Sequence, residues 1–197
     1  MSVTIVSFFT PQDDYPKQAE RFVGELEALG LEYFVAEAPD QGSYLANIRQ
    51  KALVCWRSLL QLGKPILFVD VDGTVCRKPD LDLSVDFAAV PKPEDHPRRW
   101  FVGCLFFNYT TAGIDLAQRW VRATGDWSDE SALDDVWKAG EWEGTWLELG
   151  PEYMEILRNE NADPSPDTVV AIRLSKGRQK MAFHASGRTE RPTKVAG

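Results

Sequence analysis

Two aspartates separated by one residue follow an apolar run near the middle of the chain. Ile66 to Val69 is uninterrupted by polar residues, which is typical of a strand covered on both faces, and Asp70 and Asp72 come directly after it. Residues two apart on a strand point to the same side, so the two carboxylates can converge. Converging carboxylates repel each other unless a cation or a proton joins them. The pair therefore predicts a site for Mn²⁺ or Mg²⁺, with phosphate oxygens completing the shell.

The elements before this pair alternate between strands and helices. The patterns predict strands over 3–9, 32–36 and 65–69, and helices over 17–29 and 43–62. This order is typical of an α/β fold, a Rossmann-like domain with a mainly parallel central sheet flanked by helices. In open sheets of this kind, ligands bind at the C-terminal ends of the strands, where Asp70 and Asp72 lie.

The second half of the chain continues this organisation with weaker patterns. They predict strands over 101–107, 146–149 and 168–174, a short apolar piece over 87–90, and helices over 111–124 and 131–138. The chain has 197 residues, of which 44% are hydrophobic and 26% charged. These values are ordinary for a globular protein and favour one domain over 1–174, followed by a tail over 175–197.

The residues around the acidic pair resemble a motif of one enzyme family. Asp70-Val-Asp72-Gly-Thr-Val75 is similar to the first motif of the haloacid-dehalogenase-type phosphohydrolases. That resemblance implies a Mg²⁺-dependent phosphohydrolase with Asp70 as the nucleophile and Asp72 as the general acid–base. The family usually carries this motif on the first strand of its domain, whereas two strands and two helices are expected before it here.

A set of motifs in order along the chain resembles a second family, the GT-A glycosyltransferases of the nucleotide-diphospho-sugar transferase group. These domains open on a strand whose end holds the nucleotide and carry Asp-x-Asp on a later strand. The further matches are the segment 103–108, Trp120, the pair Asp129-Glu130, where Gln is usual at the second position, and the segment 184–187. The resemblance implies a metal-dependent glycosyltransferase that moves a sugar from a nucleotide-diphosphate sugar, with a UDP-sugar as the expected donor.

The same resemblance assigns roles to individual residues. Asp70, Asp72 and His184 are expected to bind the metal. Asp129 and Asn108 are the candidate catalytic residues, which would orient the sugar or act as a base. The expected donor-binding residues are Thr10, Tyr15, Lys51, Asp70, Ser186 and Arg188.

Several of these residues also fit a purely structural role. A carboxylate in the first turn of a helix, such as Asp129, is stabilised by the helix dipole, and an Asn after a strand, such as Asn108, often forms a turn. Lys51 also fits a helix surface. A third hypothesis is a non-catalytic module that binds nucleotide sugars. The acceptor stays open among a glycan, a small molecule, a protein and a modified nucleic acid, and the resemblance favours retention of configuration.

Charge is distributed unevenly along the chain. Lys and Arg number 22 against 30 Asp and Glu, a net charge of −8, which disfavours a polyanionic partner on average. The segment 171–197, however, holds seven cationic residues and one acidic residue. We expect the basic tail to close over the donor diphosphate, the alternative being a solvated tail. The net charge therefore does not exclude a nucleic-acid acceptor.

The remaining composition bears on location. The three cysteines show no C-x-x-C spacing, which favours reduced thiols. The sequence holds no stretch of about 18–20 apolar residues, and its first ten residues lack the basic region of a signal peptide. We therefore expect a cytoplasmic protein without a membrane span.

Overall fold

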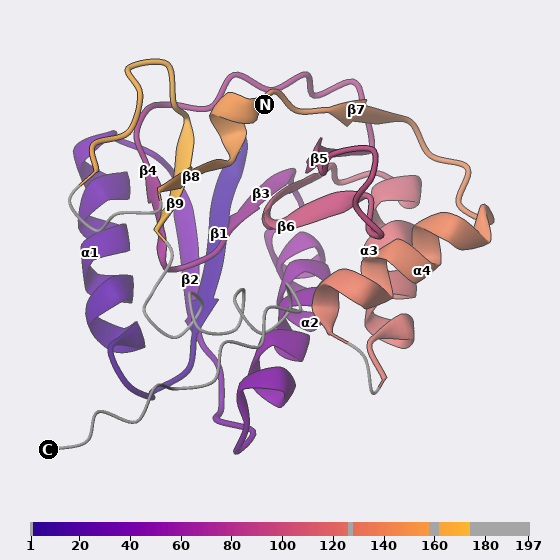
Figure 1. The fold of residues 1–197 in the computed structure, drawn as a ribbon, viewed down its shortest axis with the longest axis horizontal. Coiled ribbons are helices and arrows are strands. Elements are labelled where there is room, and N and C mark those ends of the chain that lie inside the picture. Colours follow the sequence, from indigo (N-terminus) through magenta and orange to yellow (C-terminus); the bar gives the residue numbers. More distant parts are fainter. Residues whose placement is uncertain (1, 126–127, 158–161, 174–197) are drawn as a thin grey trace, which may run out of the picture.

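A six-stranded sheet forms the centre of the molecule (Figure 1). The computed structural model describes residues 2–125, 128–157 and 162–173. The sheet has the order β2-β1-β3-β6-β5-β7, built from β1 (Thr4–Phe9), β2 (Tyr33–Glu37), β3 (Ile66–Val69), β5 (Phe87–Pro91), β6 (Trp100–Phe107) and β7 (Trp146–Glu148). Only β6 runs against its neighbours in this sheet, and the other five strands share one direction. The predicted α/β fold with a mainly parallel central sheet is confirmed.

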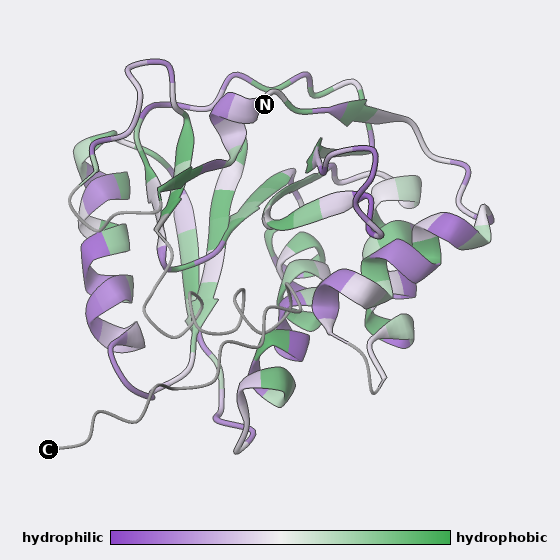
Figure 2. Ribbon diagram, viewed as in Figure 1, coloured by the Kyte–Doolittle hydropathy of each residue, from purple (hydrophilic) through white to green (hydrophobic). Residues whose placement is uncertain are grey.

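Helices cover both faces of this sheet. The helices are α1 (Tyr15–Ala28), α2 (Tyr44–Leu62), α3 (Thr111–Ala123) and α4 (Asp129–Ala139). Leu67 and Val69 of β3 pack in one cluster with Phe22 of α1, whereas Ile66 and Phe68 pack on the other face with α2, α3 and α4. Because β3 is covered on both sides, its sequence is apolar throughout. Figure 2 shows the matching pattern on α1, where hydrophilic and hydrophobic residues alternate around the helix.

A second, smaller sheet lies on the same side as α1. It has the order β4-β9-β8 and consists of β4 (Gly73–Val75), β8 (Glu155–Leu157) and β9 (Val170–Arg173), with the 3-10 helix η1 (Pro151–Tyr153) preceding β8. The sequence predicted β9 but neither β4 nor β8, because three residues are too few to show a period. Because β4 begins at Gly73, the acidic pair lies in a tight turn between β3 and β4.

Caps explain where the helices of the site begin. Ser43 precedes α2, and its hydroxyl accepts a hydrogen bond from the backbone N–H of Ala46. Ser128 does the same for α4, accepting from the N–H of Ser131. The last helix therefore begins at Asp129, two residues earlier than the sequence predicted.

Two further expectations concerned reduced cysteines and membrane-spanning helices. Cys55, Cys76 and Cys104 are free thiols. Burial raises the pKa of the Cys55 and Cys104 thiols far above the ordinary value, so both stay protonated. Every helix in the described part of the chain is too short or too polar to cross a bilayer. The cytoplasmic location stays a prediction.

Candidate active site

A buried lysine joins two carboxylates at one edge of the central sheet. The Nζ atom of Lys51 lies 2.8 Å from Oδ1 of Asp70 and 2.9 Å from Oδ2 of Asp129, and it donates to the carbonyl oxygen of Val102 at 3.1 Å. Lys51, Asp70 and Asp129 are 3%, 7% and 4% exposed. Buried charges need partners of opposite sign. Each of the three therefore fixes the position of the others.

Each member of this trio comes from a different element. Lys51 lies in α2, on the face that packs against the sheet. Asp70 directly follows β3, and its backbone N–H donates to the carbonyl oxygen of Gly103 at 2.9 Å. Asp129 is the first residue of α4, and its carbonyl oxygen accepts a hydrogen bond from Nε1 of Trp120 at 2.7 Å. Residues far apart in the sequence thus meet at the C-terminal end of β3.

A pocket of about 340 Å³ opens at this edge. It lies between the end of β1, the start of α1, the N-terminal turns of α2 and the turn after β3. Five of the predicted site residues line it: Thr10, Tyr15, Lys51, Asp70 and Asp72. The volume is within the range of small-molecule sites, which runs from about 300 to 1,000 Å³. The structure therefore brings these five predicted residues to one cavity, and Asp129 joins them through Lys51.

The turn that carries Asp72 is closely packed. Asp72 is buried, and the N–H of Gly73 donates to the carbonyl oxygen of Asp70 at 2.7 Å. A Cβ atom on residue 73 would lie 2.8 Å from that same oxygen and 2.8 Å from Cδ1 of Ile172. Contacts this short cannot be accommodated without shifting the backbone. Glycine is therefore required between the acidic pair and β4.

The two aspartates supply hard oxygen donors, which suit Mg²⁺ or Mn²⁺. The carboxylates of Asp70 and Asp72 are the groups that would hold a cation, and Oδ1 of Asp70 also contacts Lys51. No group of three His, Cys, Asp or Glu side chains with the arrangement of a metal site occurs among the described residues. Magnesium sites often use one or two protein carboxylates together with substrate phosphates. The pair fits a cation held jointly with a phosphorylated ligand.

Comparisons with known proteins relate the fold to that of glycosyltransferases. No family model matches the chain, and no curated protein does. A glycosyltransferase involved in the glycosylation of the major capsid of PBCV-1 superposes with a TM-score of 0.69 at 14% identity, over 95% of this chain and all of that one. The chain has a GT-A-like glycosyltransferase fold.

Two further solved structures share this GT-A-like fold. The glycosyltransferase GlyE of Streptococcus pneumoniae TIGR4 has a TM-score of 0.59 at 12% identity, over 96% of this chain and 62% of GlyE. The galactosyltransferase LgtC, solved with donor and acceptor sugar analogs, has a TM-score of 0.53 at 12% identity, over 98% of each chain. At these identities the likeness concerns the fold alone.

Within the GT-A-like fold, Asn108 does not join the site. It follows β6, which runs antiparallel to β3, so it lies at the opposite end of the sheet from Asp70. Its Nδ2 donates to the carbonyl oxygens of Leu83 and Val85 at 2.7 and 2.9 Å. These bonds fasten the loop before β5. The structure therefore corrects the expected contact with the donor sugar and supports the turn interpretation.

An amide network that the sequence pattern did not predict lines the part of the pocket nearest the start of α2. Nδ2 of Asn47 donates to Oε1 of Gln12 at 3.1 Å and to Oδ1 of Asp40 at 3.0 Å. Hydrogen bonds from Asn47 and from the N–H of Gly42 hold the pKa of Asp40 below its ordinary value. Asn47 lies one turn before Lys51 on the same helix face. The signal available in the sequence was the pair Asn47 and Lys51, two polar residues one turn apart on the buried face of the helix.

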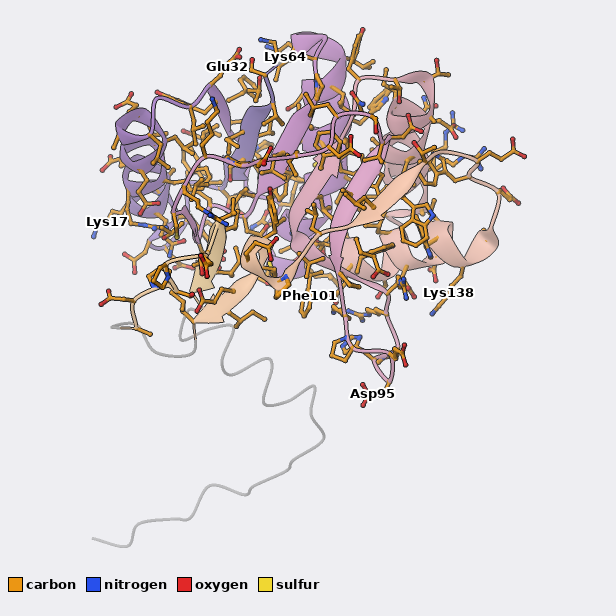
Figure 3. The ribbon with its side chains drawn as sticks, turned by 90° about the horizontal axis from the view of Figure 1, so that it is seen from above. Lys17, Glu32, Lys64, Asp95, Phe101 and Lys138 are labelled. Atoms are coloured by element: carbon orange, nitrogen blue, oxygen red, sulfur yellow. The ribbon has the colours of Figure 1, made fainter. Side chains whose placement is uncertain are left out.

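Glu130, where the family usually has Gln, takes part in a neighbouring cluster. Burial acts to raise its pKa, but ion pairs with Lys92 and Arg98 outweigh this and hold the pKa below its ordinary value. Both cations belong to the hairpin between β5 and β6, which Figure 3 shows beside α4, with Asp95 at its tip. Glu130 therefore fastens this hairpin to the helix that begins at Asp129.

Three predicted site residues come from the end of the chain. His184, Ser186 and Arg188 lie outside the described residues, as does the whole basic tail over 175–197. Their roles toward the metal and the diphosphate stay predictions.

Proposed function

We propose that this chain is a metal-dependent glycosyltransferase that uses a nucleotide-diphosphate sugar, with a UDP-sugar as the first donor to test. The observation that carries the proposal is the pocket that Asp70, Asp72 and Lys51 line together. It lies at the C-terminal ends of β1 and β3, the usual ligand site of such sheets. The GT-A-like fold shared with three glycosyltransferases supports the same assignment.

The chemistry needs stabilisation of a leaving group. Glycosyl transfer breaks the bond between the anomeric carbon and a diphosphate oxygen, and negative charge accumulates on that diphosphate. A divalent cation, held by Asp70 and Asp72, supplies charge stabilisation when bound. Lys51 keeps Asp70 in place and adds positive charge beside the pocket.

The other residues in and beside the pocket would bind either the nucleoside or the sugar of the donor. The ring of Tyr15 can stack on the base, and the hydroxyl of Thr10 can hydrogen-bond the nucleoside. The Gln12–Asn47 amides offer polar groups beside them. Asp129, fixed by Lys51, would orient the hydroxyls of the donor sugar.

The basic tail completes the proposal. Ile172 of β9 is the register partner of Gly73, so β9, which precedes the tail in the sequence, lies directly beside the acidic turn. A tail that starts there can reach the diphosphate. We assign His184 to the metal and Ser186 and Arg188 to the diphosphate within one catalytic domain, 1–174, and its tail.

Thermal unfolding with ligands tests this proposal. A ligand that binds only the folded state raises the melting temperature, and at 100 times its Kd it adds about 2.7 kcal/mol. We expect UDP with Mn²⁺ to raise the melting temperature of the wild type but not that of Asp72→Asn. A positive result is followed by transfer assays with UDP-sugars. No shift with any nucleoside diphosphate and metal would contradict the proposal.

The two alternatives give different outcomes. The phosphohydrolase hypothesis draws on Gly73 and Thr74 after the acidic pair, yet both have structural roles here, Gly73 in the close turn and Thr74 as a partner of Arg21. Hydrolysis of an aryl phosphate that disappears in Asp70→Asn would favour that hypothesis. Binding of a nucleotide sugar with neither transfer nor hydrolysis would favour a non-catalytic module.

A further inference from the structure

An arginine from α1 holds the turn that carries the acidic pair. The Nη1 atom of Arg21 donates to Oγ1 of Thr74 at 2.6 Å, and Nη2 donates to the carbonyl oxygens of Gly73 at 2.8 Å and Val71 at 3.3 Å. Nη1 also lies 2.8 Å from Oε1 of Glu25, one helical turn along. Three of these four contacts therefore reach the segment 71–74, which contains Asp72.

The turn is held from its other side by backbone structure. Gly73, Thr74 and Val75 pair with β9, and Gly73 fits only because it lacks a side chain. The carbonyl oxygen of Val71, in the peptide group before Asp72, accepts from Arg21, and the N–H of Gly73, in the peptide group after it, donates to the carbonyl oxygen of Asp70 at 2.7 Å. The carbonyl oxygen of Gly73, one peptide group further on, also accepts from Arg21. Fixing the peptide groups on both sides of Asp72 fixes the direction in which its side chain leaves the backbone.

From these contacts we infer that Arg21 is a positioning residue for Asp72. It holds the turn over 71–74 so that the Asp72 carboxylate is presented to a divalent cation in the pocket. The inference rests on the proposed function for the cation and on the observed hydrogen bonds for the positioning. Replacing a residue that orients a metal ligand through hydrogen bonds commonly lowers metal affinity by about 10–100-fold.

Arginine suits this role better than lysine. The planar guanidinium presents five N–H donors in a fixed fork, so one side chain can reach a hydroxyl and two carbonyls together. An ammonium on a flexible stem is a single point that cannot span the three acceptors in the same way. Arg21→Lys is therefore expected to restore only part of what Arg21→Gln loses.

The test measures Mn²⁺ affinity in the presence of UDP by electron paramagnetic resonance of the free ion. We expect Arg21→Gln to weaken binding by about 10–100-fold, with Thr74→Val and Arg21→Lys between that variant and the wild type. Glu25→Gln removes the ion pair within α1 but none of the turn contacts, and should bind Mn²⁺ like the wild type. At saturating Mn²⁺, kcat of Arg21→Gln should return toward the wild-type value, a recovery that general loss of structure would not give.

Amide hydrogen exchange provides a readout that needs no metal. Arg21→Gln and Thr74→Val should speed exchange over 71–75, whereas Glu25→Gln should not. If the wild type binds no divalent cation, the proposed function fails, and the positioning of the turn is then judged by exchange alone. Unchanged exchange over 71–75 in Arg21→Gln overturns the inference, as does unchanged Mn²⁺ affinity in a chain where Asp72→Asn abolishes binding.

Discussion

Both ends of the central sheet carry Asp or Asn side chains next to strand ends, but the partners of these side chains differ. At one end, Asp86 accepts hydrogen bonds from the hydroxyl of Thr110 and from the N–H and hydroxyl of Thr145. Asn108 uses its amide on two backbone carbonyls of the preceding loop. Neutral hydroxyls and backbone groups of neighbouring segments thus surround this cluster, and its bonds tie loops together.

The other end is organised around charge and a cavity. There Lys51 lies between Asp70 and Asp129, and Asp70 and Asp72 line the pocket. The comparison shows that an Asp or Asn after a strand is not informative by itself. What separates the two ends is the kind of partner each residue has: backbone and hydroxyl groups of adjoining loops in one case, and a buried cation beside a pocket in the other.

The largest expected effect is at the charged end. Lys51→Met leaves Asp70 and Asp129 buried without their cation, and breaking a buried ion pair in this way costs about 3–5 kcal/mol of unfolding free energy. Urea denaturation measures it. Lys64→Met, which removes a partly exposed ion pair with Glu32 on another part of the molecule (Figure 3), should cost about 1 kcal/mol or less. Equal losses of unfolding free energy in the two variants would contradict the special role of the buried lysine.

Asp72→Asn should separate the two ends by activity. The metal contribution to charge stabilisation amounts to several kcal/mol, so transfer is expected to fall by about 100–1,000-fold. Asp86→Asn changes the same residue type at the far end and should leave kcat near the wild-type value. Steady-state kinetics with the donor found in the binding screen provides the measurement. An Asp86→Asn loss as large as that of Asp72→Asn would contradict the assignment of the site.

Asn108→Ala should affect stability without affecting binding. Its removal leaves the carbonyl oxygens of Leu83 and Val85 without their donor, which costs about 2 kcal/mol in unfolding free energy. The affinity for UDP with Mn²⁺, measured by calorimetry, should not change. A loss of affinity with unchanged stability would restore the sugar contact that the sequence suggested.

The smallest effect is a pH dependence at the loop-tying end. Burial acts to raise the pKa of Asp86, but hydrogen bonds from Thr110 and Thr145 outweigh it and lower that pKa. An unfolded Asp titrates near about 3.9, so this contribution to stability is present above about pH 4 and is lost as the pH falls through the folded value. Asp86→Asn should be less stable than the wild type by about 1 kcal/mol at about pH 7, and the difference should shrink as the pH falls toward about 2. Urea titrations at several pH values check this, and a gap that widens in acid would refute it.

The sequence predicted the order of the main elements and pointed to five residues that line the pocket, for identifiable reasons. β3 is a buried run and α2 a long amphipathic helix, so both appear in the pattern to within about two residues. The carboxylate pair could be located because it follows that run. Asp129 and Lys51 came from the ordered resemblance, and the structure brings both beside Asp70.

What the sequence could not predict depends on distant partners. Arg21 resembles any cation on the polar face of α1, and its acceptors at 71–74 lie far along the chain. Asn108 was placed wrongly because a strand-end Asn that faces a ligand and one that fastens a loop have the same local sequence. β4 was missed because its pairing with β9, rather than its own three residues, makes it a strand.

The shared lysine also has a consequence for how the chain assembles. Lys51 and Asp70 are synthesised well before Asp129, so the ammonium group gains its second carboxylate partner only after the later part of the chain has been made. The N-terminal half can form β1, α2 and β3 early because they are neighbours in the sheet and on it. Docking of α4 then brings in Asp129 as the second carboxylate partner of Lys51, so we expect completion of the site to be a late step of folding.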